Sequence, residues 1–320
     1  MEERRVGHSG LRVSRLGLGS LTWGRDTDEH EAAEQVVAFV EAGGTLIDTA
    51  ASYGDGAAEA LIGKLLSSVI SREEIVLCTK AGASRRDGRL RTDPSRRALL
   101  ADLDASLRRL GTDHVDLWLV RGWSDAVPLE ETLSALAMAV SSGRARYVGV
   151  SNYTGWQVAH AHTLARHGLG GGLGGAVELV ATEVEYSLVQ REAERELIPA
   201  AHALGVGVLA WSPLGRGVLT GKYRGGMPAD SRGASPHLAG FVEPYLDARS
   251  RRIVDAVVIA ADGLGSAPLE VALAWARDRI GIASVLVGAR TSAQLRTALA
   301  AEDLELPTEI RMALDEVSAD

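Results

Sequence analysis

The stretch Leu46-Ile47-Asp48-Thr49-Ala50-Ala51-Ser52-Tyr53-Gly54 opens with a short apolar run and continues into a polar segment. A short apolar run followed by turn-forming residues is typical of a buried strand. Upstream, Asp28 and Glu31 have the spacing of a capping box, which predicts the start of a helix that ends near Gly43. The sequence therefore predicts a helix, a strand that ends at Asp48, and a loop that carries Tyr53.

The alternation of strand and helix continues outward from this stretch. We expect strands at residues 16–19, 46–48, 75–79, 115–120, 147–151, 177–186, 206–211 and 285–288, most of them followed by a helix. Repeated strand–helix units imply parallel strands with right-handed crossovers. Eight such units can close into a barrel, but they can also form an open doubly wound sheet. Periodicity does not distinguish between these two folds.

Composition narrows the class of protein. The chain has 320 residues and a formal net charge of −8, from 34 basic and 42 acidic side chains, which argues against a broad nucleic-acid or membrane surface. The single cysteine, Cys78, cannot form an internal disulfide, and no apolar run reaches the length of a membrane span. We expect one domain over residues 1–320, a cytoplasmic location, and no nucleic-acid or membrane partner.

Chemically useful side chains follow the predicted strand ends. Asp48 ends one strand, Tyr53 lies in the loop after it, and Lys80 directly follows the next strand. In parallel neighbours, a carboxylate, a phenol and an ammonium would meet at one mouth. A nearby ammonium lowers the pKa of a phenol, which suits a proton donor. The structural alternative is that Asp48 caps an element, Tyr53 packs in its loop and Lys80 pairs with a surface acid.

Other catalytic patterns are absent from the sequence. The eight histidines have no metal-ligand spacing, so we expect no metal site. No G-x-S-x-G motif occurs, which argues against a nucleophile-elbow hydrolase.

Several ordered motifs resemble the aldo-keto reductase superfamily over nearly the whole chain. They are Leu46-Ile47-Asp48-Thr49-Ala50 with Tyr53-Gly54, Thr79-Lys80, Val148-Gly149-Val150-Ser151-Asn152-Tyr153, Glu185-Tyr186-Ser187-Leu188, the run from Trp211 to Tyr223, and Val287-Gly288-Ala289-Arg290. The resemblance implies an α/β fold, a (β/α)8 TIM barrel. An N-terminal β-hairpin, predicted around His8-Ser9-Gly10, would close its bottom, and an additional helix would follow at the C-terminal end.

The resemblance also implies a function. NADPH would lie across the strand ends and pass a hydride to the carbonyl carbon of an aldehyde or ketone. Tyr53 would donate the proton, tuned by Lys80 and Asp48. The implied cofactor-binding residues are Ser151 and Asn152 at the carboxamide, Trp211 under the nicotinamide, Ser212, Leu214, Gly217 and Lys222 at the pyrophosphate, and Gly288, Arg290 and Gln294 near the 2′-phosphate.

The sequence departs from the family pattern at three positions. Arg121 stands where the family usually has a catalytic histidine, Glu183 where it has a carboxamide-binding glutamine, and Ala298 where it has an adenine-binding asparagine. Opposite charges at one mouth can offset each other. We therefore expect an ion pair between Arg121 and Glu183, and we count both residues as part of the site.

These departures leave the reaction open. The alternatives to carbonyl reduction are reduction of an activated C=C bond or an imine, a regulatory or sensor subunit that binds NADP(H) with slow chemistry, and a barrel that has lost its cofactor. A small-molecule substrate is expected, with Trp23 and Trp123 either forming an aromatic wall around it or packing on the rim. The sequence gives no indication of oligomeric state.

Overall fold

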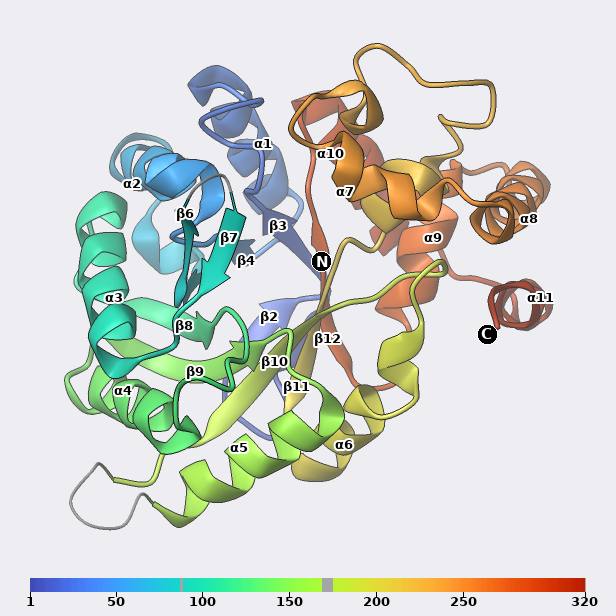
Figure 1. Ribbon diagram of the computed structural model, residues 1–320. Helices are drawn as coiled ribbons and strands as arrows, with labels where there is room; N and C mark the ends of the chain where they lie inside the picture. Colours follow the sequence, from blue (N-terminus) through green and yellow to red (C-terminus); the bar gives the residue numbers. More distant parts are fainter. Residues whose placement is uncertain (87–88, 169–174, 320) are drawn as a thin grey trace.

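The computed structural model describes residues 1–86, 89–168 and 175–319 (Figure 1). Within these residues, eight parallel strands close into a barrel in the order β10-β11-β12-β3-β4-β5-β8-β9. The closed barrel confirms the (β/α)8 fold and excludes the open sheet. The barrel strands are β3 Leu16–Gly19, β4 Leu46–Asp48, β5 Val76–Ala81, β8 Val115–Val120, β9 Ala145–Ser151, β10 Leu179–Glu185, β11 Gly207–Trp211 and β12 Ile282–Val287.

Amphipathic helices surround the barrel (Figure 1). They are α1 Glu29–Glu41, α2 Ala57–Ser68, α3 Arg96–Leu110, α4 Leu129–Ser141, α5 Gly155–His167, α6 Leu197–Leu204, α8 Ala248–Leu264, α9 Pro268–Arg277 and α10 Ser292–Leu299, followed by the predicted C-terminal helix α11 Thr308–Ser318. Helix α3 shows the local logic, since Leu99 and Leu103 are fully buried, Ser95 caps its start and Gly111 ends it in a left-handed conformation.

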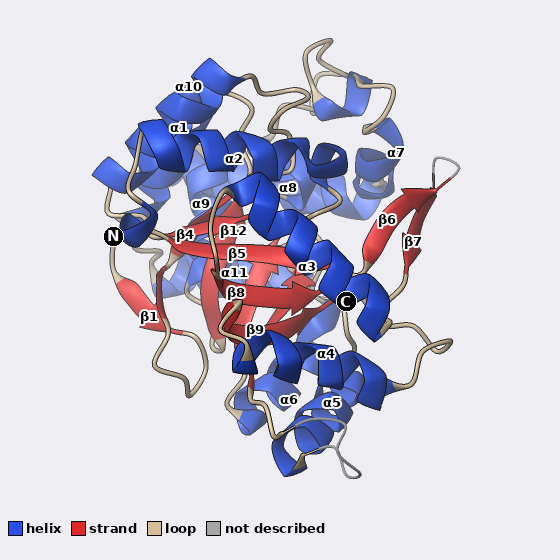
Figure 2. Cartoon of the chain, turned by 90° about the vertical axis from the view of Figure 1, so that its left-hand side faces the viewer, coloured by secondary structure: helices blue, strands red, loops and turns tan. Residues whose placement is uncertain are grey.

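The N-terminal hairpin closes one end of the barrel. Strands β1 Glu3–Arg5 and β2 Arg12–Ser14 pair antiparallel, as the sequence predicts. Val6 and Val13 are fully buried and join the interior cluster that contains Leu46 and Leu117. Figure 2 shows β1 at one end of the barrel and the hairpin of β6 Ala83–Arg86 and β7 Arg89–Thr92 at the other.

Two segments differ from the sequence expectation. The β6–β7 hairpin was not predicted, because its arginine-rich strands lack an apolar alternation. The glycine, proline and serine residues at 222–240 are typical of a loop. The segment nevertheless holds a short 3₁₀ turn, η5 (Arg232–Ala234), and the start of α7 (Ala239–Val242). Both segments lie after strand ends, where connections vary most between barrels.

Among the described residues, no single helix has the length and apolar character of a membrane span. Helices α8 and α9 meet that criterion only as a pair, and their axes are bent by 101° at the break between them.

Candidate active site

The strand ends bring the predicted polar groups to one mouth. Asp48 is the last residue of β4 and is paired in register with Cys78 of β5, two residues before Lys80. Glu183 lies near the end of β10, opposite Ser151 of β9. Tyr53 begins the 3₁₀ turn η1 (Tyr53–Gly56) after β4.

Lys80 lies between two carboxylates inside this mouth. Its Nζ donates to Oδ1 of Asp48 and, at 2.8 Å, to Oε2 of Glu183. The exposed fractions are 1% for Lys80, 3% for Asp48 and 1% for Glu183. Burial alone would lower the pKa of Lys80, but the two carboxylates raise it well above its ordinary value. Lys80 therefore stays charged at neutral pH.

The expected ion pair between Arg121 and Glu183 was wrong. In the part of the chain that the structure describes, Glu183 makes its ion pair with Lys80, and none within 4.0 Å joins it to Arg121. The guanidinium carbon of Arg121 instead lies 5.6 Å from the centre of the Tyr53 ring. The two substituted residues still share one electrostatic environment, because Glu183 helps to raise the pKa of Arg121 against the effect of burial.

Tyr53 lies close to two cations. Nζ of Lys80 is 5.7 Å from the ring centre, a similar distance to that of Arg121. The sequence argument predicted a lowered pKa, but burial raises the pKa of Tyr53 above 10.0, and the two cations offset this only in part. Tyr53 is therefore a neutral phenol at physiological pH, which is the form that can donate a proton.

Asp48 is the group whose charge changes near neutral pH. Burial, and then the neighbouring Glu183, raise its pKa to about 7, while Lys80 acts in the opposite direction. A carboxylate oxygen of Asp48, one of Glu183 and Sγ of Cys78 lie within 4.8 Å of one another, a spacing found among metal ligands. Here the ammonium of Lys80 binds both carboxylates.

The ends of β9 and β11 meet beside this cluster. Asn152 has a left-handed φ of 58°. Its side-chain amide donates to the carbonyl of Arg121 at 3.0 Å and to Oγ of Ser151 at 2.9 Å. Its Oδ1 accepts from Nε1 of Trp211 at 3.1 Å. Since a carbonyl oxygen has two lone pairs and the Ser151 hydroxyl keeps its own proton, both side chains retain capacity for a carboxamide ligand.

The sequence analysis missed the aromatic and ionic neighbours of Trp211. The Trp211 and Phe241 rings are nearly parallel, at 11° with centroids 6.5 Å apart. The guanidinium carbon of Arg216 lies 3.7 Å from the Phe241 ring centre, and its Nη2 pairs with Glu185 at 2.6 Å. These contacts hold the Trp211 indole in place at the mouth. Phe241 lies in a short helical segment far along the chain from Trp211, so no sequence motif indicates that the two rings meet.

The segment after β11 forms a compact turn. Ser212 has a φ of 53° and Gly217 one of 99°, and the 3₁₀ helix η4 (Gly215–Thr220) continues the turn. Backbone hydrogen bonds run back to Ser212 and to Leu214, whose carbonyl accepts from Gly217 at 2.9 Å. A Cβ on Gly217 would lie 3.1 Å from Nζ of Lys222. The glycine therefore leaves room between the backbone and an ammonium, the arrangement of an anion cradle.

Three cations gather beyond this turn. Burial and then the guanidinium groups of Arg232 and Arg290 lower the pKa of Lys222. Burial and then Arg290 likewise lower the pKa of Arg232. Asp230 is a weak counter-charge, 4.0 Å from Nη2 of Arg290 and 87% exposed. Cations that gather in this way form a site for an anion with several charges, and the donor set fits the phosphates of NADPH.

The remaining residues of this motif surround the same site. Nη2 of Arg232 donates to the carbonyl of Gly288 at 3.3 Å, and the Gln294 side chain accepts from the backbone N–H of Arg290 at 3.0 Å. Ala298 is buried within α10 at 2% exposure. Arg232 was not in the predicted site, because a lone arginine in a segment rich in glycine, proline and serine gives no signal by itself.

The two tryptophans predicted near the substrate do not form one wall. Trp23 is fully buried in the core and donates to Oε1 of Gln35 at 3.2 Å, so the structure corrects its assignment to substrate binding. Trp123 is only partly buried. Its ring packs edge-on against Tyr153 at 5.2 Å and against Trp156 at 5.4 Å. Trp123 thus remains at the rim as part of a different aromatic cluster.

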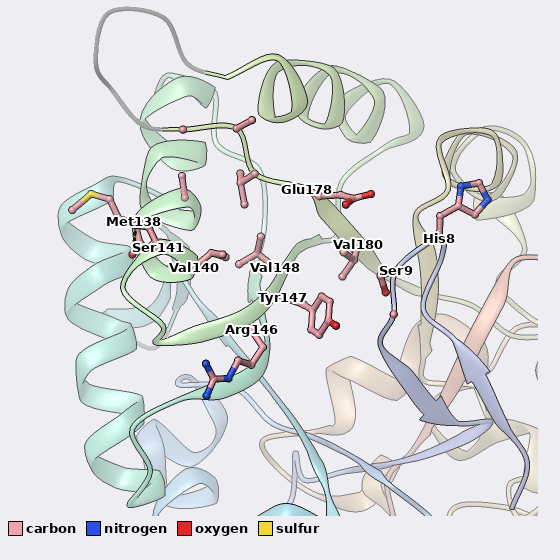
Figure 3. Close-up of a pocket in the computed structure, with 15 residues that line it drawn as sticks. His8, Ser9, Met138, Val140, Ser141, Arg146, Tyr147, Val148, Glu178 and Val180 are labelled. Atoms are coloured by element: carbon pink, nitrogen blue, oxygen red, sulfur yellow. Dashed lines mark hydrogen bonds between the residues drawn. The ribbon is translucent and has the colours of Figure 1, made fainter.

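A separate cavity lies at the opposite end of the barrel. It has a volume of about 510 Å³ and lies beside the β1–β2 turn and the starts of β9 and β10. Figure 3 shows His8, Arg146, Tyr147 and Glu178 around it. None of the predicted site residues lines this cavity, because its walls come from residues at the bottom of the barrel.

Comparison with known proteins identifies one family and several similar proteins. The sequence model of the Aldo/keto reductase family matches residues 15–319. The chain is 33% identical to "Uncharacterized oxidoreductase YrpG" of Bacillus subtilis (strain 168), over 99% of this chain and 96% of that protein. It is 34% identical to "Protein tas" of Escherichia coli (strain K12), over 99% and 97% of the two chains. It is also 32% identical to "Probable voltage-gated potassium channel subunit beta" of Oryza sativa subsp. japonica, over 92% and 89%.

Proposed function

Since this chain belongs to the aldo/keto reductase family and is similar to oxidoreductases, we propose that it is an NADPH-dependent reductase of small carbonyl compounds. The observation that carries the proposal is the neutral phenol of Tyr53 at the barrel mouth, beside the buried Lys80 that two carboxylates hold in place. The substrate is proposed to be an aldehyde or ketone, with no nucleic-acid or membrane partner.

In this proposal, NADPH supplies the hydride when it is bound. The Tyr53 hydroxyl donates a hydrogen bond to the carbonyl oxygen and then transfers its proton to that oxygen as negative charge develops. The charged Lys80 stabilises the resulting phenolate, since an opposite charge nearby favours the ionised form. Asp48 and Glu183 keep Lys80 charged and fixed. General acid catalysis of this kind contributes about 10² to 10⁴-fold to a rate.

The cofactor assignment rests on the two ends of the mouth. Ser151 and Asn152 retain hydrogen-bonding capacity for a carboxamide, and Trp211 provides a flat π-surface beside them. At the far end, the cluster of Lys222, Arg232 and Arg290 suits phosphate groups and favours NADPH over NADH.

The test combines binding with turnover. Purified protein is titrated with NADPH and with NADH by fluorescence, and NADPH oxidation is then followed with aldehydes, ketones, enones and imines. The proposal predicts tighter binding of NADPH than of NADH, and turnover of carbonyl compounds. Turnover confined to enones or imines would replace carbonyl reduction by one of those reactions. Absence of NADPH binding would reject the cofactor assignment.

One second candidate has a specific observation behind it. A relative carries the name of a potassium channel subunit, and Arg121 replaces the usual histidine. A regulatory subunit would bind NADPH tightly but turn over all substrates slowly. Turnover above about 1 s⁻¹, within the usual range for enzymes, favours the reductase.

A further inference from the structure

Arg121 is held in a fixed position at the mouth. Its backbone N–H donates to the carbonyl of Ala81 at 2.8 Å, and its carbonyl accepts from the Asn152 side chain at 3.0 Å. Its guanidinium carbon lies 5.6 Å from the ring centre of Tyr53, the proposed proton donor. The two hydrogen bonds fix the backbone of Arg121 at the mouth, and from there its side chain reaches the Tyr53 ring.

The charges around Arg121 leave it without a carboxylate of its own. Both buried carboxylates of the mouth, Asp48 and Glu183, contact the ammonium of Lys80. Over the described residues, no ion pair within 4.0 Å involves Arg121. A guanidinium has five N–H donors, and the position of Arg121 beside the Tyr53 ring leaves them available to a ligand. Arg121 is partly exposed. Its guanidinium therefore remains accessible to a substrate that is bound beside Tyr53.

The position of these donors determines which anion they would bind. Tyr53 contacts the carbonyl oxygen in the proposed reaction, and the guanidinium of Arg121 lies beside the Tyr53 ring. An anionic group bound by Arg121 must therefore lie next to the carbonyl. A carboxylate matches the planar fork of a guanidinium and can accept two hydrogen bonds from it.

We propose that Arg121 selects 2-oxo acids, binding the carboxylate next to the carbonyl that is reduced. This inference rests on the proposed reductase function. In the reaction, a hydride from NADPH adds to C2 and the Tyr53 proton adds to its oxygen. The products are a 2-hydroxy acid and NADP⁺, and the carboxylate is unchanged.

The test compares an acid with its neutral ester. Phenylglyoxylate and methyl phenylglyoxylate carry the same ketone and differ by one charge, and neither contains a reducible alkene or an imine. The kcat/KM of each is measured at saturating NADPH for the wild type, Arg121→Gln, Arg121→Lys and Arg290→Gln. The ratio of acid to ester cancels any general effect of a substitution on Tyr53.

The inference predicts that the wild type prefers the acid, and that Arg121→Gln lowers the acid-to-ester ratio by about 10- to 100-fold, the worth of a hydrogen bond to a charged group. Arg121→Lys should retain part of the preference. Arg290→Gln should weaken cofactor binding but leave the acid-to-ester ratio unchanged. This control separates the loss of Arg121 from the loss of positive charge elsewhere at the mouth.

Two results overturn the inference while the reductase function stands. One is a wild type that reduces the ester and neutral aldehydes better than the acid. The other is an acid-to-ester ratio unchanged in Arg121→Gln. If the wild type binds NADPH but reduces none of these compounds, the proposed function itself fails, and the inference fails with it.

Discussion

The buried ammonium of Lys80 shows how one side chain organises this mouth. Removing three charged groups from water is costly, and the cost is recovered only when their partners are well placed. Lys80 satisfies two carboxylates that would otherwise repel each other. Removing one partner of a buried pair typically destabilises a protein by about 3–5 kcal/mol. The same ammonium holds positive charge beside Tyr53. Stability and chemistry therefore both depend on Lys80.

The raised pKa of Asp48 predicts a pH-dependent stability. Its pKa is about 7 in the folded protein, above its ordinary value of 3.8, so the folded state binds this proton more tightly. The resulting stabilisation is fully present below pH 3.8 and is lost as pH rises through 7. Asp48→Asn cannot titrate and removes the effect.

Thermal unfolding of the wild type and of Asp48→Asn between pH 5 and 8.5 tests this prediction. We expect the stability of the wild type relative to the variant to fall by up to about 1.4 kcal/mol per pH unit from pH 5 to 7 and then to level off. A difference that is constant over the whole range would show that Asp48 is already ionised at pH 5.

Sequence reasoning predicted part of the residue-scale picture. Asp48, Tyr53 and Lys80 converge because parallel strands end at the same edge, and the sequence indicates those ends. The partner of Glu183 was mistaken, because charge alone does not reveal which of two cations a side chain reaches. The pKa of Tyr53 was predicted in the wrong direction, since the sequence does not show how strongly burial acts on the phenol.

At the scale of elements, separate segments build the phosphate end of the mouth. Lys222 follows η4, Arg232 begins η5, and Arg290 lies between β12 and α10. Loops at the carboxyl ends of barrel strands commonly supply such groups. Sequence analysis predicted the barrel strands to within about three residues, because apolar runs indicate them. It missed the contribution of η5, because its position depends on tertiary contacts.

Arg290→Ala should weaken NADPH binding by about 10-fold or more, as expected for a lost charge-assisted contact. It should change NADH binding much less, because NADH lacks the 2′-phosphate. Fluorescence titration measures both dissociation constants. Arg311→Ala, at an exposed position of α11, serves as the control for loss of an arginine and should alter neither. An equal loss of affinity for both cofactors would place Arg290 away from the 2′-phosphate.

For the whole molecule, the two ends of the barrel have different tasks. The β1–β2 hairpin seals one end with buried apolar side chains, and the charged mouth lies at the other. In such barrels, residues at the bottom usually serve stability and residues at the top usually serve catalysis. Changes at the hairpin should therefore affect stability without affecting cofactor binding.

Gly7→Ala tests this separation. Gly7 has a φ of 58°, and a Cβ there would lie 2.1 Å from the carbonyl oxygen of Gly205. Gly111 has a similar φ of 65° but no atom within 4 Å of its Cβ position. Both substitutions introduce left-handed strain of about 1–2 kcal/mol, and Gly7→Ala adds a clash. We expect a lower melting temperature for Gly7→Ala than for Gly111→Ala, with unchanged NADPH affinity in both. Similar melting temperatures would mean that the hairpin shifts to accommodate the methyl group.

The central claim is that Tyr53 donates the proton in an NADPH-dependent reduction, and Tyr53→Phe tests it most directly. The substitution removes one oxygen and keeps the ring. We measure NADPH oxidation with a carbonyl substrate that the wild type reduces, and NADPH affinity in the same samples. The account predicts a loss of kcat of about 10² to 10⁴-fold with NADPH affinity within about twofold of the wild type. Turnover close to that of the wild type would contradict the claim, because another group would then supply the proton.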